Sequence, residues 1–350
     1  MQEHSLPEAD PVRKSTGPAG PTVGDVSRRP YPRPGPIAGA PDRVPGSVRR
    51  TTSLDLSRPL GPDGPIEVRG RGRDARTTTT GDLEILATAL VSLTVSEERV
   101  TRLQAHPSPA GLSRLLGRRA VVGWRTGLWR ELPSEKDSGS ALHLLLDDLP
   151  GGMIIGGFTG RAARLEASAT LTEPGRRLNV CAGWAAESRA ALEMATTGLP
   201  PAPQTEPAPA LTPADDPYAW HTLPALARWG ISRRRRLDVP DTGAEILVDT
   251  MFRDSFSDGT GAERVLHEYH LTALLDRDTF VVREISAQPR VLPHGECPLA
   301  AGSVQALRGV PAPQLRERVS AELFGPASCT HLNDLARSVT DAPALVRART

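Results

Sequence analysis

Two of the three cysteines in this 350-residue chain lie where helices are predicted to begin. Cys297 directly precedes a proline, and Gly309 follows the predicted helix, a pairing that is typical of a helix start and a helix end. Cys329 lies among serine and threonine residues that can cap the next helix. Unpaired N–H groups and the helix dipole at such positions favour a thiolate over a thiol. We therefore expect both sulfurs to bind a metal ion or to attack an electrophile.

Histidines near these cysteines supply the nitrogen donors of a possible metal site. His331 follows Cys329 by two positions, so on a regular helix their side chains would point roughly 200° apart. Both could bind one ion only if Cys329 precedes the helix. His267 is therefore the preferred nitrogen ligand, with His294 and Glu296 as substitutes. The predicted metal ligands are Cys297, Cys329, His267 and His331.

Two other functions remain open. In a thiol enzyme, Cys329 would be the nucleophile, a histidine the base and Asp334 the acid that orients the base. In a binding module, the arginines at 69–73 and from Arg233 to Arg236 could hold phosphates or an acidic partner protein. On an edge strand, however, such arginines are typical of solvated charges that prevent pairing. Aromatic residues make up only 4% of the chain, which leaves little surface for stacking bases, so a nucleic-acid partner is disfavoured.

Composition limits the class of protein. Lysine plus arginine number 42 and the acidic residues 41, so the net charge of +1 implies no attraction of the whole chain to nucleic acid or an anionic membrane. The basic residues are nearly all arginine, which is typical of a GC-rich bacterial genome. The N-terminus lacks the apolar segment of a secretory signal, and no stretch approaches about 18 uninterrupted apolar residues. We expect a cytoplasmic protein without a disulfide framework.

Proline and glycine, with 34 and 32 residues, are unevenly distributed along the chain. Residues 1–45 are rich in proline, glycine and arginine and have scarcely any apolar periodicity, which predicts a disordered tail. Residues 199–217 form a proline- and alanine-rich segment that is typical of a stiff, extended linker. These segments leave two folded parts, residues 46–198 and 218–350.

The two folded parts repeat the same order of segments. VRRTTSLDL from Val48 corresponds to SRRRRLDV from Ser232, and SALHL from Ser140 corresponds to SCTHL from Ser328. This order predicts an internal duplication of one α+β unit, in which a small antiparallel sheet is covered on one face by helices.

The two parts differ at their cysteines. Ala141 corresponds to Cys329, whereas His143 corresponds to His331. Cys297 lies in the segment RVLPHGECPL, which the first part lacks. We therefore expect the first part to be structural and the second part to carry the site. The pairing of Cys329 with Cys297 becomes the main hypothesis, and the shared histidine is expected to serve mainly in packing or capping.

Three shorter segments have distinct patterns. Residues 269–275 and 280–285 alternate apolar and polar residues around Asp276-Arg277-Asp278, which predicts a β-hairpin. Cys181, in LNVCAGW, has no ligand type nearby and is predicted to lie in the core or in a turn. GGMIIGGFTG from Gly151 lacks the spacing of a phosphate-binding loop and is predicted to be a strand with flexible ends.

The order of motifs in the second part resembles a known family. RRRR, FRDSFSDGTG, HEYHL, LPHGECPLA and SCTHLNDLAR follow one another in residues 233–337. This order is similar to the bacterial family catalogued as domain of unknown function 2889, whose marks are an arginine-rich first strand, a CP step and a late CTHL. The first part is similar more weakly, as a copy without the paired cysteines. The resemblance implies no particular activity.

The layout is also similar, more remotely, to that of NifU-type iron–sulfur scaffold proteins. By position, this resemblance places His267 near the first ligand, Cys297 on the helix cysteine and Cys329 near the last ligand pair. Here the histidine follows the last cysteine, and the first ligand is a histidine instead of cysteine or aspartate, which disfavours an iron–sulfur cluster. Two sulfur donors with one or two nitrogen donors are instead typical of zinc.

Overall fold

One antiparallel sheet joins strands from both parts of the chain. The computed structural model describes residues 34–166, 178–240, 243 and 245–349. The nine strands of the described residues are β1 (Val48–Ser57), β2 (Ile66–Thr77), β3 (Leu83–Ser96), β4 (Arg99–His106), β5 (Glu206–Pro207), β6 (Ile231–Val239), β7 (Glu245–Ser257), β8 (Glu263–Asp276) and β9 (Val282–Val291).

Short helices follow each set of strands. The α-helices of the described residues are α2 (Trp124–Glu131), α3 (Pro133–Ser138), α4 (Ala141–Asp147), α5 (Leu149–Glu166), α6 (Arg189–Thr197), α7 (Leu315–Glu322), α8 (Thr330–Ser338) and α9 (Ala342–Arg347). The 3₁₀ segments are η1 (Leu112–Leu115), η2 (Ala182–Trp184), η3 (Cys297–Leu307), η4 (Ala312–Gln314), η5 (Gly325–Ala327) and η6 (Val339–Asp341).

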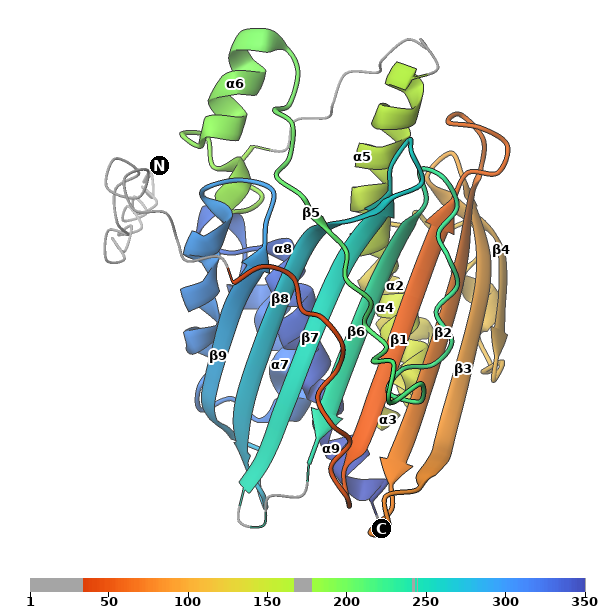
Figure 1. Ribbon diagram of the computed structural model, residues 1–350, viewed down its shortest axis with the longest axis vertical. Helices are drawn as coiled ribbons and strands as arrows, with labels where there is room; N and C mark the ends of the chain where they lie inside the picture. Colours follow the sequence, from red (N-terminus) through yellow and green to blue (C-terminus); the bar gives the residue numbers. More distant parts are fainter. Residues whose placement is uncertain (1–33, 167–177, 241–242, 244, 350) are drawn as a thin grey trace, which may run out of the picture. The chain divides into compact units, whose positions relative to one another are not determined.

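The strand order is symmetric about the centre of the sheet. Neighbouring strands follow the order β4-β3-β2-β1-β6-β7-β8, and both β9 and the two-residue β5 pair with β8 (Figure 1). The central strands β1 and β6 are antiparallel, with Thr52 opposite Arg235. The predicted α+β class with antiparallel strands is confirmed, but the strands form one sheet rather than one sheet in each part. Common ancestry of the two parts stays a prediction.

The predicted hairpin is confirmed. β8 and β9 pair as neighbours, with Ala273 opposite Ile285. In the turn between them, the Asp276 carboxylate accepts a hydrogen bond of 2.9 Å from the backbone N–H of Thr279. Aspartate is favoured in such turns because its side chain can bond to the backbone a few residues ahead. The turn chemistry was therefore readable from the sequence.

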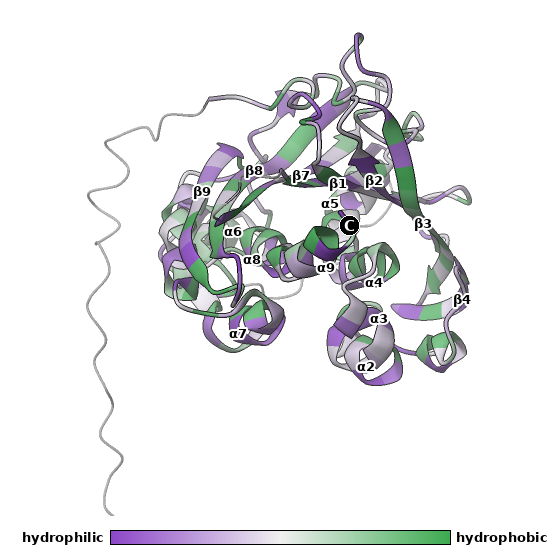
Figure 2. Cartoon of the chain, turned by 90° about the horizontal axis from the view of Figure 1, so that it is seen from below, coloured by the Kyte–Doolittle hydropathy of each residue, from purple (hydrophilic) through white to green (hydrophobic). Residues whose placement is uncertain are grey.

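Helices cover the concave face of the sheet, where two apolar cores are separated by charge. α4, α5, α8 and α9 lie inside the curve of the strands (Figure 2). One apolar core includes Leu54 and Leu145, and the other includes Phe252 and Leu335. A set of buried charged residues lies on the central strands and on the helices over them. This polar seam consists of Arg50, Asp74, Asp147, Asp148, Arg233, Arg235, Asp254, Asp334, Arg337 and Asp341.

Two extended segments cross the other face of the sheet (Figure 1). The Arg253 guanidinium donates to the backbone carbonyls of Ile37 and, at 2.7 Å, of Pro209. Leu211 and Trp220 pack beside Met251 in a small apolar cluster. Residues 34–45 and 199–217, which composition assigned to a tail and a linker, therefore pack against the sheet. Residues 1–33 of the predicted tail lie outside the described residues.

The prediction of a strand for GGMIIGGFTG is wrong, because this segment lies within helix α5. Gly151 lies so close to Arg233 that an added Cβ would be 1.9 Å from Nη1 of that guanidinium. A helix with glycines on the face toward the sheet can approach closely enough to cover the arginine, and this packing overrides the low helix propensity of glycine. Among the helices of the described residues, none is long and apolar enough to cross a membrane.

The expectation that Arg233 to Arg236 lie on a solvated edge strand is also wrong. They lie on β6, which has β1 on one side and β7 on the other, and none is more than 6% exposed. Alternate side chains point to opposite faces of a strand. Arg233 and Arg235 accordingly reach Asp148 and other members of the polar seam, whereas Arg234 reaches Glu263 on the opposite face. The charges are neutralised by acids within the fold.

Candidate metal centre

Three side chains from three elements converge at the concave face of the second part. Asp254 and His267 are directly opposite each other on β7 and β8, next to a β-bulge between Asp254 and Ser255. His331 enters from the first turn of α8. All three residues are buried, and the ligand atoms that they offer lie within 4.8 Å of one another. These residues form the candidate site.

The geometry of the candidate site centres on one carboxylate oxygen. Asp254 Oδ2 lies 3.8 Å from Nδ1 of His267 and 3.7 Å from Nε2 of His331. The two imidazole rings are stacked, with centroids 3.7 Å apart and an interplanar angle of 17°. Nδ1 of His267 has no hydrogen-bond partner among the described residues. An ion could therefore use this nitrogen without breaking a hydrogen bond to another described residue.

Burial controls the protonation of the site. Burial, reinforced by the neighbouring His331 and Arg233, holds the pKa of His267 well below its ordinary value, so this imidazole is neutral near neutral pH. Burial also raises the pKa of Asp254 to about 6, although Arg233 favours the ionised carboxylate. A metal ligand must be a neutral imidazole or an ionised carboxylate. Both conditions are met above the pKa of Asp254.

The Arg233 guanidinium binds both oxygens of the Asp254 carboxylate. Its Nε and Nη2 donate to the two oxygens at 2.8 Å and 2.9 Å, and its Nη1 donates to Asp334 at 2.5 Å. Each carboxylate oxygen carries two lone pairs, so Oδ2 can accept from the guanidinium and still bind an ion. A hydrogen-bond donor that holds a carboxylate in this way orients it for binding an ion.

Asp334, the predicted orienting acid of a thiol enzyme, is surrounded by arginines. Its carboxylate accepts hydrogen bonds from Arg125 at 2.8 Å, from Arg233 and from Arg337. Burial opposes ionisation of Asp334, but the three guanidinium groups outweigh it and lower the pKa. These contacts give Asp334 a part in the polar seam.

The two predicted site cysteines occupy the predicted helix starts, but as thiols. Cys329 is the N-cap residue of α8, and Cys297 is the first residue of η3. Burial raises the pKa of Cys329 to about 11 and that of Cys297 well above its ordinary value. The expectation that helix N-termini would stabilise thiolates is wrong for the metal-free protein, because loss of solvation outweighs the nearby N–H groups.

The structure brings the four predicted ligands to two neighbouring places. His267 and His331 meet at the candidate site, and Cys329 Sγ lies 4.0 Å from Nδ1 of His331, on the other side of the ring from Asp254. Cys297 lies beside Tyr269, whose hydroxyl is 3.5 Å from the Cys297 carbonyl.

The two predicted substitutes have other partners. The His294 ring packs edge-on against Trp184 with centroids 5.5 Å apart. The Glu296 carboxylate accepts from the backbone N–H of Arg189 at 2.8 Å.

Asp254 is the site residue that sequence reasoning missed. A signal was present, because FRD in the second part corresponds to GRD at Asp74 in the first part. In the structure, Arg50 binds Asp74 at 2.7 Å, as Arg233 binds Asp254. The residue opposite Asp74 is Ala87, whereas the residue opposite Asp254 is His267.

The first part therefore retains an aspartate and a histidine but lacks the second histidine and the cysteine. Its His143 is fully buried, and neither ring nitrogen has a hydrogen-bond partner among the described residues. Burial, with a contribution from Arg316, lowers the pKa of His143 to about 3. The donor set is complete only in the second part.

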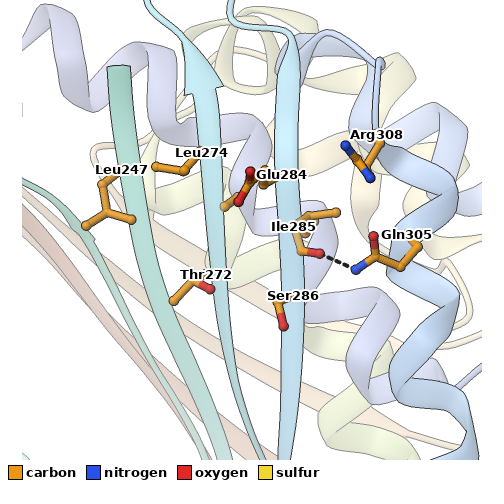
Figure 3. A pocket seen from close by; sticks show the side chains of 9 residues that line it. Leu247, Thr272, Leu274, Glu284, Ile285, Ser286, Gln305 and Arg308 are labelled. Carbon is orange, nitrogen blue, oxygen red and sulfur yellow. Dashed lines mark hydrogen bonds between the residues drawn. The ribbon is translucent and has the colours of Figure 1, made fainter. Parts of the chain in front are cut away.

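A small pocket of about 110 Å³ lies at the start of α8, where Thr330, Asp334 and Arg125 contribute to its wall. A larger one of about 460 Å³ is lined by β7, β8, β9 and the η3 end, away from the candidate site (Figure 3). There Gln305 donates to the Ile285 carbonyl, and Glu284 and Arg308 are the charged residues of the lining. The metal-ligating residue types gather at the candidate site and not in the larger pocket.

Comparison with known proteins supports the family suggested by the motifs. Residues 231–344 match the family model described as protein of unknown function (DUF2889). Neither a curated protein nor a solved structure matches the chain. The matched segment covers less than half of the chain, but it contains Asp254, His267 and His331. The part of the chain that carries the candidate site is thus similar to a protein family whose function is unknown.

Proposed function

We propose that the second part of this protein binds one divalent transition-metal ion through Asp254, His267 and His331. The supporting observation is the convergence of these three donors from separate elements at one buried place. Metal–ligand bonds of about 2.0 to 2.2 Å separate neighbouring ligand atoms by roughly 3.3 to 3.6 Å. The observed separations from Asp254 Oδ2, 3.7 Å and 3.8 Å, are close to this range.

The donor set favours zinc or ferrous iron as a single ion. Two imidazoles with one carboxylate leave coordination positions open, as in catalytic zinc sites and in non-haem iron centres. Iron–sulfur clusters are held mainly by thiolates, so they suit this donor set less well. The two histidine side chains are each 11% exposed, which gives an ion and one further ligand a route to the site.

Binding requires a local change in ring orientation. The lone pair of an imidazole nitrogen lies in the plane of the ring, and the two planes here are nearly parallel and 3.7 Å apart at their centroids. One ring must therefore turn about its Cβ–Cγ bond before both nitrogens can reach one ion. Such torsions are broad and soft for histidine. The bound state should lack the stacked pair.

Cys329 is a positioning residue in this proposal. Its sulfur faces Nδ1 of His331, whereas Nε2 faces Asp254. The Cys329 sulfur can accept a hydrogen bond from a protonated Nδ1, which leaves Nε2 with the lone pair needed for the ion. In this proposal Cys329 supports His331 without binding the ion, whereas the sequence suggested a direct ligand.

Metal analysis of the purified full-length chain tests the proposal. We expect about one equivalent of zinc or iron per chain by plasma mass spectrometry, and its loss in His267→Gln and His331→Gln. His143→Gln is the matched control, because His143 is the corresponding buried histidine of the first part. A protein that remains metal-free after incubation with zinc and with ferrous iron would contradict the proposal, as would full metal content in both site variants.

Cobalt substitution distinguishes the two roles of Cys329. If Cys329 only orients His331, the cobalt-loaded protein lacks a sulfur-to-cobalt charge-transfer band, and Cys329→Ser binds the ion roughly 10- to 100-fold more weakly. A charge-transfer band that disappears in Cys329→Ser would instead make Cys329 a direct ligand. Cys297→Ser serves as the control for a buried thiol beside Tyr269.

A further inference from the structure

The three cysteines of the chain are brought together, although they are far apart in the sequence. Cys181 precedes η2, Cys297 begins η3 and Cys329 precedes α8. All three side chains are thiols in the structure. Cys181 was predicted from sequence to lie alone in the core or in a turn, so its proximity to the other two is a consequence of the tertiary fold.

Cys181 and Cys329 lie on peptide groups that are hydrogen-bonded to each other. The backbone N–H of Ala182 donates to the carbonyl of Ser328 at 2.9 Å. The backbone is extended at both cysteines, with φ and ψ of −162° and 173° at Cys181 and −132° and 124° at Cys329. This hydrogen bond holds the backbones of the two cysteines next to each other. A disulfide requires such closeness, because it spans Cα separations of about 4.4 to 6.8 Å.

Cys297 approaches the same place from the other side. Its sulfur lies 2.5 Å from the position that a Cβ on Gly183 would occupy, so it packs directly on the backbone of η2. The Tyr269 hydroxyl lies 3.5 Å from the Cys297 carbonyl. Burial raises the pKa of that hydroxyl well above its ordinary value, and all three sulfurs add to the shift. The backbone N–H of Cys297 donates to the carbonyl of His294, and within the described part of the chain the Cys297 backbone makes no hydrogen bond to the segments of the other two cysteines. Cys297 is therefore the third member of the group and not the first choice for a bond.

Solvent exposure determines which of the three thiols an oxidant reaches first. Cys181 is partly exposed, whereas Cys297 and Cys329 are 6% and 4% exposed. A small oxidant therefore reaches Cys181 before the two buried sulfurs.

We propose that Cys181 and Cys329 form an oxidation site in which a hydroperoxide converts the two thiols into an intramolecular disulfide. In the first step the Cys181 sulfur attacks the peroxide oxygen, the O–O bond breaks, and a sulfenic acid and an alcohol, or water, are formed. In the second step the Cys329 sulfur attacks the Cys181 sulfur, the S–O bond breaks and water leaves. The two thiols together lose two electrons and two protons, and the hydroperoxide is reduced by the same two electrons.

A shared metal ion is a weaker use of the three thiols. In the described residues, the group of donors that lies within 4.8 Å consists of Asp254, His267 and His331 and contains no cysteine. The oxidation proposal does not rest on the proposed metal site, because its readout is a covalent bond. A negative result for metal binding leaves it unchanged.

Peptide mapping tests the proposal, because trypsin separates the three cysteines. Cleavage after arginine yields peptides 178–189, 291–308 and 319–337, each with one cysteine. The reduced full-length protein is treated with a small excess of hydrogen peroxide, quenched with N-ethylmaleimide and digested without reductant. We expect peptide 178–189 to be joined to 319–337 in a chain that stays monomeric on a non-reducing gel. Peptide 291–308 should carry the alkyl group.

Variants make the assignment specific. Cys181→Ser and Cys329→Ser should abolish the cross-link, whereas Cys297→Ser, the matched control, should retain it. Circular dichroism checks that each variant is folded. If a variant does not fold, the peptide map of the wild-type protein still identifies which two cysteines are joined. A cross-link that contains peptide 291–308, a bond between chains, or peroxide treatment that yields only oxidised but unlinked cysteines would overturn the proposal.

Discussion

Arg233 controls the charge of the candidate site. Its guanidinium is fully buried and binds three carboxylates, those of Asp254, Asp334 and Asp148. Burial disfavours the charged guanidinium, but these acids outweigh it and raise the pKa of Arg233. The polar seam therefore depends on a positive charge that has no access to water. Removing the Arg233 guanidinium would therefore leave its buried carboxylates without their counter-charge.

Arg233→Met should destabilise the protein strongly. Removing one partner of a buried ion pair costs about 3 to 5 kcal/mol, because the remaining carboxylates are left without a counter-charge. Urea denaturation at neutral pH measures the effect as a lower midpoint. Arg71→Met is the control, since Arg71 is 33% exposed and its pair with Asp55 should contribute less than about 1 kcal/mol. Equal losses in the two variants would contradict this account of the seam.

His143 should make the protein sensitive to acid. The pKa of His143 is lowered to about 3 in the folded state, against an ordinary value of 6.5. Between these two pH values the unfolded chain binds a proton at this residue and the folded chain does not. The stability from this residue is present above pH 6.5 and is lost as pH falls toward 3. At about pH 5 the loss amounts to about 2 kcal/mol.

His143→Leu tests this pH dependence, because leucine has a similar volume and no proton to bind. The measurement is the difference in free energy of unfolding between about pH 7.5 and pH 5. We expect this difference to be smaller in the variant than in the wild-type protein by roughly 2 kcal/mol. An identical difference in the two proteins would show that His143 can be protonated in the folded state with little loss of free energy.

In helix α5, packing against Arg233 determines the secondary structure more than the intrinsic preference of the residues does. Its glycines do not favour a helix, and the sequence pattern suggested a strand. Gly151 nevertheless has to lie in the helix, because its missing side chain leaves the space that Arg233 fills. Gly156, five residues further along, has only ordinary contacts, since an added Cβ would be 3.9 Å from Ile231 and Leu56. The two glycines therefore have different roles on one helix.

Alanine at these two positions should have opposite effects. Gly151→Ala should lower the free energy of unfolding by about 1 to 3 kcal/mol, because Arg233 is held by three carboxylates and cannot move aside. Gly156→Ala should raise it by up to about 1 kcal/mol, through the higher helix propensity of alanine. Thermal denaturation followed by circular dichroism measures both. Stabilisation by Gly151→Ala would show that the arginine is mobile.

At the scale of the whole molecule, each part contributes a strand arginine that forms an ion pair with an aspartate of the other part. Arg50 on β1, in the first part, binds Asp341 just before α9 at 2.8 Å. Arg233 on β6, in the second part, contacts Asp148 just before α5 at 3.4 Å. Together with the pairing of β1 with β6, these contacts couple the parts in both directions. The parts should therefore unfold together.

Asp341→Asn tests this coupling. Asp341 is fully buried and also binds Arg316, so its neutralisation leaves two guanidinium groups without their acid. Hydrogen exchange should then accelerate to a similar degree in β2 of the first part and β8 of the second part. Asp63→Asn is the control, because the Asp63 side chain is 72% exposed. Faster exchange confined to the second part would mean that the two parts are stable independently.

The sequence by itself determined the local features of this protein. The β8–β9 hairpin follows from alternating apolar residues around Asp276, and the helical segment at Cys297 begins at the predicted proline signal. Helix α8 begins next to Cys329 as expected, but neither Ser328 nor Thr330 caps it. These features depend on interactions between residues that are close in the chain. The two histidines of the candidate site were also named from sequence, although His331 was expected to serve mainly in packing or capping.

The tertiary structure decided what depends on burial and on distant partners. Joining β1 to β6 places the arginines of β6 in the centre of one sheet, where acids from both parts neutralise them. Burial keeps Cys329 a thiol, and pairing of β7 with β8 places Asp254 opposite His267. Solvation and long-range pairing are properties of the folded chain. For this reason a run of arginines appeared exposed and Asp254 went unnoticed until the strands were assembled.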